Sequence, residues 1–215
     1  MPRKLTSQPC WRGRDDPSPF VPGIPAQVPR PRSLKQLFSA MACCTRCELA
    51  TGRTQVVHGI GSANASVMFV GEAPGEKEDL AGEPFVGNAG RLLDRLLEEN
   101  RISRKSVFIT NIVACRPPKN RTPNVREVRE HAPWIEEQLR LVKPKLVVTL
   151  GRVALTYFVP KAKVSEIRGV PQRLAHGDHA LVVLPTFHPS AVLRDYRVLY
   201  PRVAEDFRKI AQLLG

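Results

Sequence analysis

The sequence lacks any apolar run approaching the ~18 residues of a membrane-spanning helix, which excludes an ordinary transmembrane segment. No apolar stretch follows the basic N-terminal residues, so we expect no secretory signal and a cytoplasmic location. A P-loop and a complete G-x-G-x-x-G motif are also missing, and Gly59-x-Gly61 alone is weak evidence. We therefore expect neither a membrane partner nor a nucleotide cofactor.

Acidic residues are scarce relative to basic ones. The 20 Asp and Glu stand against 33 Lys and Arg, which gives a net charge of +13 on 215 residues. Such a surplus indicates either a polyanionic partner (DNA, RNA or anionic lipid) or a solvated basic surface. Residues 1–32 contain 8 of the 20 prolines and a net charge of +4, and they predict an extended basic tail or strap. Residues 33–215 are long and apolar enough for one domain.

Cysteine is also rare, with five residues at positions 10, 43, 44, 47 and 115. An odd number in a C-C-x-x-C arrangement argues against a disulfide framework and favours a metal or cluster site. Cys44, Cys47 and Cys115 give three thiolates, whereas zinc and iron–sulfur sites prefer four ligands. His131 is the candidate for the fourth ligand, and a set of free buried cysteines is the alternative.

Short apolar runs alternate with helical periodicity after residue 33. Strands are predicted at 67–70, 107–113, 146–150 and 181–184, and helices at 33–42, around 92–97, 125–142, 152–158 and 201–214. This alternation predicts an α/β fold with a mostly parallel, four-stranded sheet covered on both faces. Ligands bind beyond the carboxyl ends of such strands, which selects segments 71–79, 111–118, 150–153 and 186–190.

Several side chains in these segments suit a binding or catalytic site. The acidic turn that contains Glu72 is either solvated or placed beside a cationic transition state, and Phe85 either stacks on a flat ligand or belongs to the core. Asn111 can pair with a base edge or simply form a turn. His188 can donate to an oxyanion or be structural. The basic loop 115–121 suits phosphates, and the apolar segment 191–194 suits either insertion into a base stack or helix packing.

Taken together, the motifs identify a family. They are C-T-R-C (44–47), G-E-A-P-G-E-K-E-D (71–79), G-E-P-F-V-G-N-A-G (82–90), T-N-I-V-A-C-R-P-P-K-N-R (110–121), L-G-R-V-A (150–154), R-G (168–169) and H-P-S-A-V-L-R (188–194). Their order and spacing, from about residue 40 to the end, resemble the family 4 uracil-DNA glycosylases, the iron–sulfur branch of their superfamily.

The resemblance implies a three-layer α/β/α sandwich that hydrolyses the N-glycosidic bond of deoxyuridine in DNA after flipping the base out. It implies that Phe85 stacks on uracil, Asn111 reads the uracil edge and His188 donates to O2 of the leaving base. Glu72 is the expected carboxylate near the base and the attacking water, with Glu78 as a helper. The turn with Gly71, Ala73 and Gly75 is expected to line the pocket. We expect a monomer.

The resemblance also implies DNA contacts around the pocket mouth. Basic contacts are expected from Arg116, Lys119, Arg121 and Arg168. Segment 190–194 is expected to fill the gap left by the flipped base, through Ser190, Val192, Leu193 and Arg194.

The family has cysteines at the positions of Cys44, Cys47, Cys115 and residue 131, but here residue 131 is histidine. Three interpretations remain: a cluster with three cysteines and one histidine, a labile three-cysteine cluster, or no cluster. Because histidine is a competent cluster ligand, we expect a 4Fe–4S cluster held by Cys44, Cys47, Cys115 and His131.

Two functions outside this expectation stay open from the sequence. One is a non-catalytic protein that binds DNA or abasic sites, against which the retained Glu72, Phe85, Asn111 and His188 argue. The other is a zinc-stabilised nucleotide-binding module, against which the missing nucleotide motifs argue.

Overall fold

The computed structural model describes residues 30–176 and 179–214, so almost all of the predicted tail lies outside the described residues. The described strands form one mixed sheet in the order β1-β3-β2-β4-β6-β5. They are β1 (Ile60–Gly61), β2 (Val67–Gly71), β3 (Phe108–Asn111), β4 (Leu146–Leu150), β5 (Gln172–His176) and β6 (His179–Thr186). The central four are parallel and the two edge strands are antiparallel.

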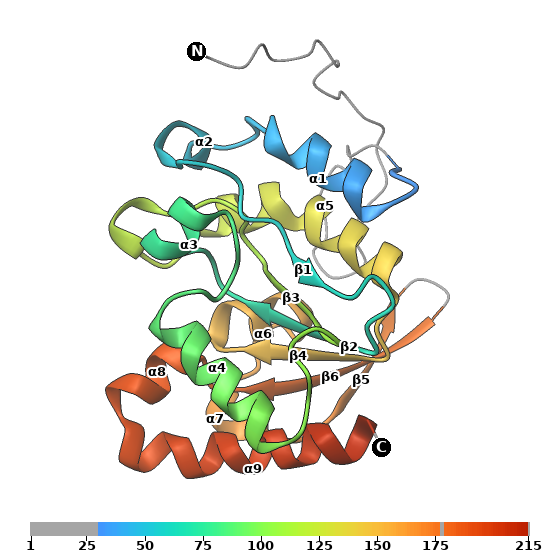
Figure 1. Cartoon of the computed structure of the whole chain (residues 1–215), viewed down its shortest axis with the longest axis vertical. Coiled ribbons are helices and arrows are strands. Elements are labelled where there is room, and N and C mark those ends of the chain that lie inside the picture. Colours follow the sequence, from blue (N-terminus) through green and yellow to red (C-terminus); the bar gives the residue numbers. More distant parts are fainter. Residues whose placement is uncertain (1–29, 177–178, 215) are drawn as a thin grey trace.

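Helices cover both faces of the sheet, which confirms the predicted α/β class and three layers (Figure 1). One face packs against α5 (Val125–Val142) and α6 (Arg152–Phe158), with α1 (Leu34–Ala42) outside α5. The other packs against α4 (Asn88–Glu99), α8 (Pro189–Arg194) and α9 (Tyr196–Leu214). The shorter α2 (Leu49–Gly52), α3 (Glu76–Ala81) and α7 (Val164–Ile167) lie in the connections, as does a 3₁₀ turn (Pro118–Asn120).

Fully buried strands explain why the sequence shows apolar runs and not alternation. In β2, the side chains of Met68 and Val70 pack in the core between the sheet and α5. Those of Val67 and Phe69 pack in the core between the sheet and the helices α4 and α9. All five β2 residues are buried. A parallel strand covered on both faces is therefore apolar at every position, as the sequence predicted for this segment.

The sheet has six strands where four were predicted. The added β1 is only two residues long, and β5 has the polar sequence QRLAH with alternating exposure. Both lie at edges, where one neighbour is missing and apolar side chains are not required on both faces. Neither strand therefore carries the buried apolar run on which the prediction depended.

The predicted helices 33–42, 125–142 and 152–158 match the structure, whereas the helix expected around 92–97 is longer and the C-terminal helix begins earlier than predicted. Ser33 accepts a hydrogen bond from the Gln36 amide and begins α1, and Asn124 and Glu127 form a capping box at α5. In contrast, α9 starts at Tyr196 and not at Pro201. Its first turn is supported by the stacked rings of Tyr196 and Tyr200, whose centroids are 4.6 Å apart. Within the described ranges, no helix has the length and apolar character to cross a bilayer.

Candidate active site

A pocket of about 420 Å³ opens beyond the carboxyl ends of β2, β3 and β6. Its lining residues are Glu72, Ala73, Pro74, Gly75, Glu78, Phe85, Ala89, Asn111, Pro117, Asn120, Arg121, Thr122, His188, Ser190, Ala191 and Arg194. Three of the four segments selected from the sequence therefore meet here. The fourth, 150–153, does not line the pocket, although Gly151 packs against His188 behind it.

Phe85 forms one wall of the pocket in a strained backbone conformation. Its φ of 57° lies in the left-handed region, which costs a bulky residue about 1–3 kcal/mol. Two glycines make room for it. A Cβ on Gly90 would lie 1.8 Å from the Phe85 carbonyl oxygen, and one on Gly71 would lie 2.6 Å from its Cζ. The ring therefore reaches the pocket because these two positions have no side chain.

Glu78 holds the backbone on two sides of the pocket. Its Oε2 accepts the Gly75 amide at 3.1 Å, and its Oε1 accepts the amides of Val86 at 3.0 Å and Gly87 at 2.7 Å. These bonds tie the turn after β2 to the segment that carries Phe85. The predicted helper carboxylate thus lines the pocket with its oxygens engaged by main-chain amides.

Asn111 ends β3 with its side chain turned toward the same space. It is 4% exposed, and its Oδ1 is buried without a hydrogen-bond partner among the described residues. A Cβ on Gly71 would lie 2.3 Å from this oxygen. Leaving a buried carboxamide oxygen unpaired is costly, so it is a ready acceptor for an N–H group of a ligand in the pocket.

His188 faces Phe85 across the pocket, with ring centroids 5.7 Å apart. Its Nδ1 accepts the Ser190 amide at 3.1 Å, so the proton of the neutral ring lies on Nε2. Burial, and next the charge of Arg194, lower the pKa of His188 to about 4. At neutral pH the side chain is therefore an uncharged imidazole with a fixed Nε2–H donor.

Glu72 supplies the carboxylate of the pocket. Burial raises the pKa of Glu72, while a hydrogen bond from Thr122 and the charge of Arg152 oppose the rise. Thr122 follows two successive residues in the left-handed region, Lys119 (φ 54°) and Asn120 (φ 55°). This bent loop brings Thr122 against Glu72 and closes the pocket on the α5 side.

The predicted ligand residues gather at a second site, between α2 and α5. The Cys47 Sγ lies 3.8 Å from His131 Nε2, and Arg53 donates to the Cys115 sulfur at 3.1 Å and to the Cys44 carbonyl at 2.6 Å. Burial and then Arg46 and Arg53 lower the pKa of His131 to about 4.

Cys47 and Cys115 both resist ionisation in this site. The pKa of Cys115 is raised to about 11, chiefly by burial; Arg53 opposes the rise, and the nearby Cys44 and Cys47 add to it. The pKa of Cys47 is also raised, again chiefly by burial. His131 is 2% exposed, and its Nδ1 has no partner in the described part of the chain.

By its chemistry this donor set fits an iron–sulfur cluster, because thiolates and neutral imidazole are established cluster ligands. In the described ranges, however, no three His, Cys, Asp or Glu side chains are arranged to hold a single metal ion.

Comparisons with known proteins decide the family. The model of the uracil DNA glycosylase superfamily matches residues 58–214. The chain is 46% identical over 169 residues to a type-4 uracil-DNA glycosylase from Thermotoga maritima, covering 77% of this chain and 86% of the relative. It is 40% identical over 187 residues to one from Sulfurisphaera tokodaii, covering 84% of each. The chain belongs to the type-4 branch of the uracil DNA glycosylase superfamily.

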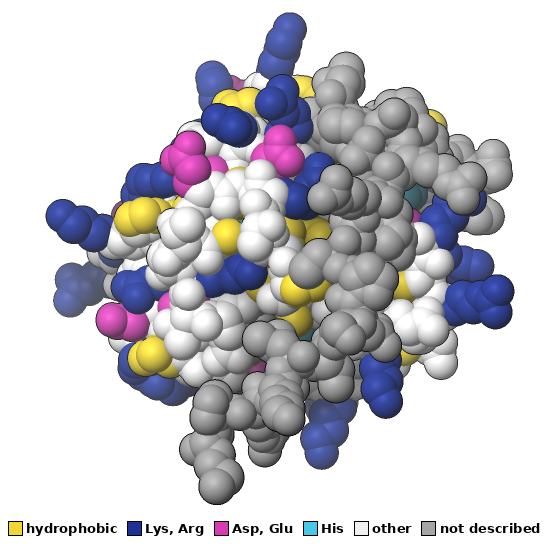
Figure 2. All heavy atoms as spheres, turned by 90° about the horizontal axis from the view of Figure 1, so that it is seen from above, with side chains coloured by type: hydrophobic (Ala, Val, Ile, Leu, Met, Phe, Trp, Pro, Cys, Tyr) yellow, Lys and Arg dark blue, Asp and Glu magenta, His cyan; other side chains and the backbone are white. Residues whose placement is uncertain are grey.

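In this type-4 family member, the residues predicted to contact DNA occupy different environments. Arg121, Ser190 and Arg194 line the pocket, whereas Arg116 bonds Asn120 and lies 3.7 Å from Glu76. Lys119 is exposed on the bent loop. On the face seen from above α1 and α2, Lys and Arg side chains are widely spread and acidic ones are fewer (Figure 2).

The segment expected to fill the DNA gap needs a correction. Leu193 is 43% exposed, but Val192 is fully buried and belongs to the core over α4 and α9. Segment 189–194 forms the helix α8, so these two neighbours point in different directions. Val192 therefore packs the fold and is not available to DNA.

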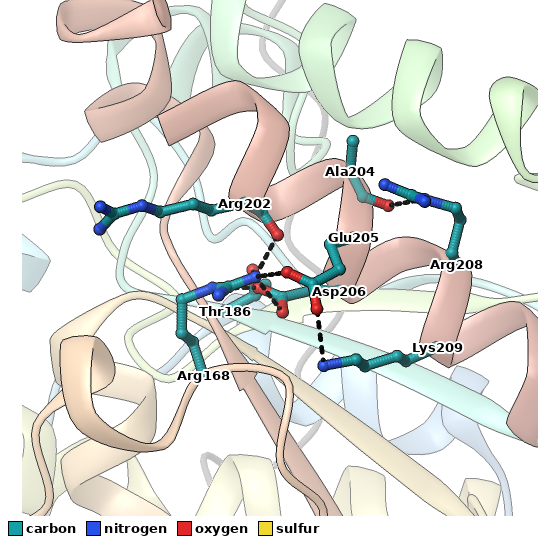
Figure 3. A network of polar contacts seen from close by, with 8 residues as sticks. All are labelled: Arg168, Thr186, Arg202, Ala204, Glu205, Asp206, Arg208 and Lys209. Atoms are coloured by element: carbon teal, nitrogen blue, oxygen red, sulfur yellow. Dashed lines mark hydrogen bonds and ion pairs between the residues drawn. The ribbon is translucent and has the colours of Figure 1, made fainter. Parts of the chain in front are cut away.

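Arg168 is also placed differently from its prediction. It is not among the pocket-lining residues, and its guanidinium is bound to α9 (Figure 3). It donates to Asp206, which is fully buried, to Glu205 and to the Arg202 carbonyl. Asp206 in turn accepts from Thr186 at 2.6 Å. Arg168 thus anchors the end of β6, two residues before His188, where the sequence suggested a DNA contact.

Sequence reasoning missed Thr122, whose hydroxyl bonds the Glu72 carboxylate. It lies one residue after the quoted basic motif, and nothing in a polar loop distinguishes a residue that contacts a carboxylate from a solvated one. Arg53, which contacts Cys115, and Arg104, which donates to the Pro84 and Phe85 carbonyls, were missed for the same reason: each contacts a segment distant in sequence.

Proposed function

We propose that this protein is a uracil-DNA glycosylase that releases uracil from DNA and leaves an abasic site. The observation that carries the proposal is the unpaired Asn111 oxygen, which shares one pocket with an aromatic ring and an uncharged imidazole donor. Together these groups offer a stacking surface, a base-edge acceptor and a leaving-group donor. The names of the type-4 relatives agree with this activity.

Asn111 would provide the discrimination between uracil and cytosine. The Oδ1 can accept from N3–H of uracil, and the amide Nδ2 can donate to O4. Cytosine has a lone pair at N3 and an amino group at C4, so both interactions would become repulsive. The Asn111 Oδ1 is buried and has no partner among the described residues. The N3–H of uracil can bond to it, whereas cytosine has no hydrogen at N3 and leaves it unpaired.

His188 would stabilise the base as it leaves. In glycosidic hydrolysis the bond between C1′ and N1 breaks, its electron pair goes to uracil, and a water oxygen bonds to C1′. That water loses a proton to solvent, and the uracil anion takes one up, so the products are neutral uracil and an abasic sugar. A neutral Nε2–H donates a hydrogen bond to O2 as negative charge develops there. Because the donor is oriented by Ser190 before the substrate binds, little reorganisation is needed during the reaction.

Glu72 would act on the positive charge that develops on the sugar. Its ionised carboxylate can stabilise the cationic sugar and orient the attacking water, supported by Thr122 and Arg152. Arg121, Arg194, Arg116 and Lys119 would contact phosphates around the mouth, and Leu193 would enter the space of the flipped base.

We further propose that Cys44, Cys47, Cys115 and His131 hold a 4Fe–4S cluster with a structural role. The cluster would join the start of the pocket loop, at Cys115, to α5, which carries His131. Arg121 lies between them and forms a two-pronged ion pair with Glu127 of α5. Ligation at both ends would therefore fix the loop that contributes Thr122 to the pocket.

The function is tested with single- and double-stranded oligonucleotides that contain one uracil, followed by alkaline cleavage of abasic sites. Wild type should cleave the uracil strand and leave a matched cytosine strand intact, and His188→Ala should be slower by about 10²–10³-fold. Wild-type protein that binds an abasic oligonucleotide but releases no uracil would favour the non-catalytic alternative.

A further inference from the structure

Arg104 lies outside the pocket, in the turn between α4 and β3, and reaches the segment that carries Phe85. Its Nη2 donates to the carbonyl oxygens of Pro84 at 3.1 Å and Phe85 at 3.2 Å. Its Nη1 donates to Asp94 Oδ1 on α4 at 2.5 Å. One planar guanidinium therefore binds the backbone with one nitrogen while the other is anchored by a helix.

The same segment is held from its other side by the opposite charge. Glu78 accepts the amides of Val86 and Gly87, immediately after Phe85. The carbonyls at 84 and 85 thus bind a cation and the amides at 86 and 87 bind an anion. A left-handed φ at a bulky residue persists only where the surroundings over-determine it, and these two side chains supply that restraint.

The restraint determines where the ring of Phe85 lies. With φ at 57°, the ring packs over Gly71 and lies 5.7 Å from the His188 ring. If the segment relaxed to an ordinary backbone conformation, the ring would leave this position. The two hydrogen bonds that Arg104 donates to this segment both go to main-chain carbonyls, so they act on the backbone conformation and not on the ring directly.

We propose that Arg104 is a positioning residue that fixes Phe85 for stacking on the base, which rests on the proposed uracil-DNA glycosylase function. The contacts need a planar group with several donors in fixed directions, because three acceptors are bound at once. Lysine would carry the charge without this geometry. Arg104 itself does not line the pocket and touches no reacting atom.

Inhibition by free uracil measures stacking separately from DNA binding. Arg104→Ala should raise the inhibition constant of uracil about fivefold and lower kcat/KM by about fivefold to tenfold, since base–aromatic stacking accounts for about that range. Arg104→Lys should recover only part of the loss. A variant that was merely less stable would lose active enzyme, and with it kcat, while the active fraction kept its inhibition constant.

The matched control is Arg95→Ala on α4. Arg95 also pairs with a carboxylate, Glu99, but it lies against the Tyr200 ring and is not among the described residues that line the pocket. This variant should keep the wild-type inhibition constant.

The decisive measurement is a double-mutant cycle that combines Arg104→Ala with Phe85→Ala. If Arg104 acts through the ring, Arg104→Ala should change the inhibition constant by less than about 1.5-fold in the Phe85→Ala background. An unchanged constant in the single variant, or an equal change in both backgrounds, would overturn the proposal.

A structural measurement separates this proposal from the proposed function. The Phe85 ring signals in ¹H–¹³C NMR spectra, assigned by their loss in Phe85→Leu, should shift in Arg104→Ala and stay in place in Arg95→Ala. If wild type releases no uracil but the signals shift, the function fails and the positioning role stands. If wild type is active and the signals do not move, the positioning role is wrong.

Discussion

Of the three buried side-chain atoms that lack hydrogen-bond partners among the described residues, Asn111 Oδ1 lies in the pocket and His131 Nδ1 lies beside the cysteines, and their surroundings differ. Around Asn111, the neighbouring groups are already held: Ser190 orients His188, and Arg104 and Glu78 restrain the segment of Phe85. The pocket is therefore organised by the chain's own hydrogen bonds.

Among the described residues, the cysteine site differs from the pocket in its electrostatics. Burial raises the pKa of Cys47 and Cys115, so the protein environment works against the thiolates that a cluster requires. Among the described residues, Arg53 is the cation that contacts a cysteine sulfur, that of Cys115. The comparison indicates that the groups of the pocket are oriented by hydrogen bonds of the chain, whereas the thiols of the cysteine site lie in surroundings that disfavour the charge the proposed cluster requires.

The largest effect is expected where the pocket is packed most closely. In Gly71→Ala the new Cβ would overlap both Phe85 and Asn111, so kcat/KM for uracil release should fall at least about 100-fold while bound iron stays at the wild-type level. Gly52→Ala is the control, because no atom lies within 4 Å of its added Cβ. Loss of iron together with activity in Gly71→Ala would show that the two sites are not independent.

The cysteine site is tested by replacing its unusual ligand. Wild-type protein purified without oxygen should be brown, His131→Ala should lose more than about half of its iron, and His131→Cys should retain it. Iron content and visible absorption provide the measurement. A colourless wild-type protein without iron would contradict the cluster proposal, and full iron in His131→Ala would remove the histidine from the ligand set.

Support behind the pocket is expected to matter more for folding than for DNA binding. Arg168→Ala leaves the fully buried Asp206 without its cation, so urea unfolding should show a loss of about 3 kcal/mol. Lys163→Ala removes only the exposed pair with Glu166 and should cost about 0.5 kcal/mol or less.

The salt dependence of DNA binding distinguishes a residue that contacts a phosphate from one that forms a structural ion pair. Arg194→Ala should lower the salt slope by about 1, as expected for one lost phosphate contact, and Arg168→Ala should leave it unchanged. A reduced slope in Arg168→Ala would restore that residue to the DNA contacts.

The sequence predicted the elements whose signals are local. Buried parallel strands such as β2 are apolar at every position, and Ser33 marks the start of α1 through a cap that needs only four residues. The edge strand β5 was missed because it is half exposed and polar. Motif resemblance placed Phe85, Asn111 and His188 in one pocket, which the structure does bring together.

What the sequence could not provide was the direction of each side chain and its distant partners. Val192 and Leu193 are adjacent apolar residues, and only the orientation of α8 separates a core residue from an exposed one. Arg168 resembles any basic loop residue until α9 places Asp206 beside it, 38 positions later in the chain. Such pairings depend on tertiary packing and leave no periodic pattern in the sequence.

The smallest expected effect concerns pH and compares two groups within the pocket. The proposed mechanism needs Glu72 ionised and His188 neutral; burial raises the pKa of Glu72 and lowers that of His188 to about 4. As pH falls from 7 to 5, Glu72 begins to take up a proton before His188 does, so kcat should fall by only about twofold to fivefold. Glu72→Gln, although slower throughout, should lose this dependence. A fall that persisted in Glu72→Gln would assign the acidic limb to His188 and show that its environment lowers the pKa less than its burial indicates.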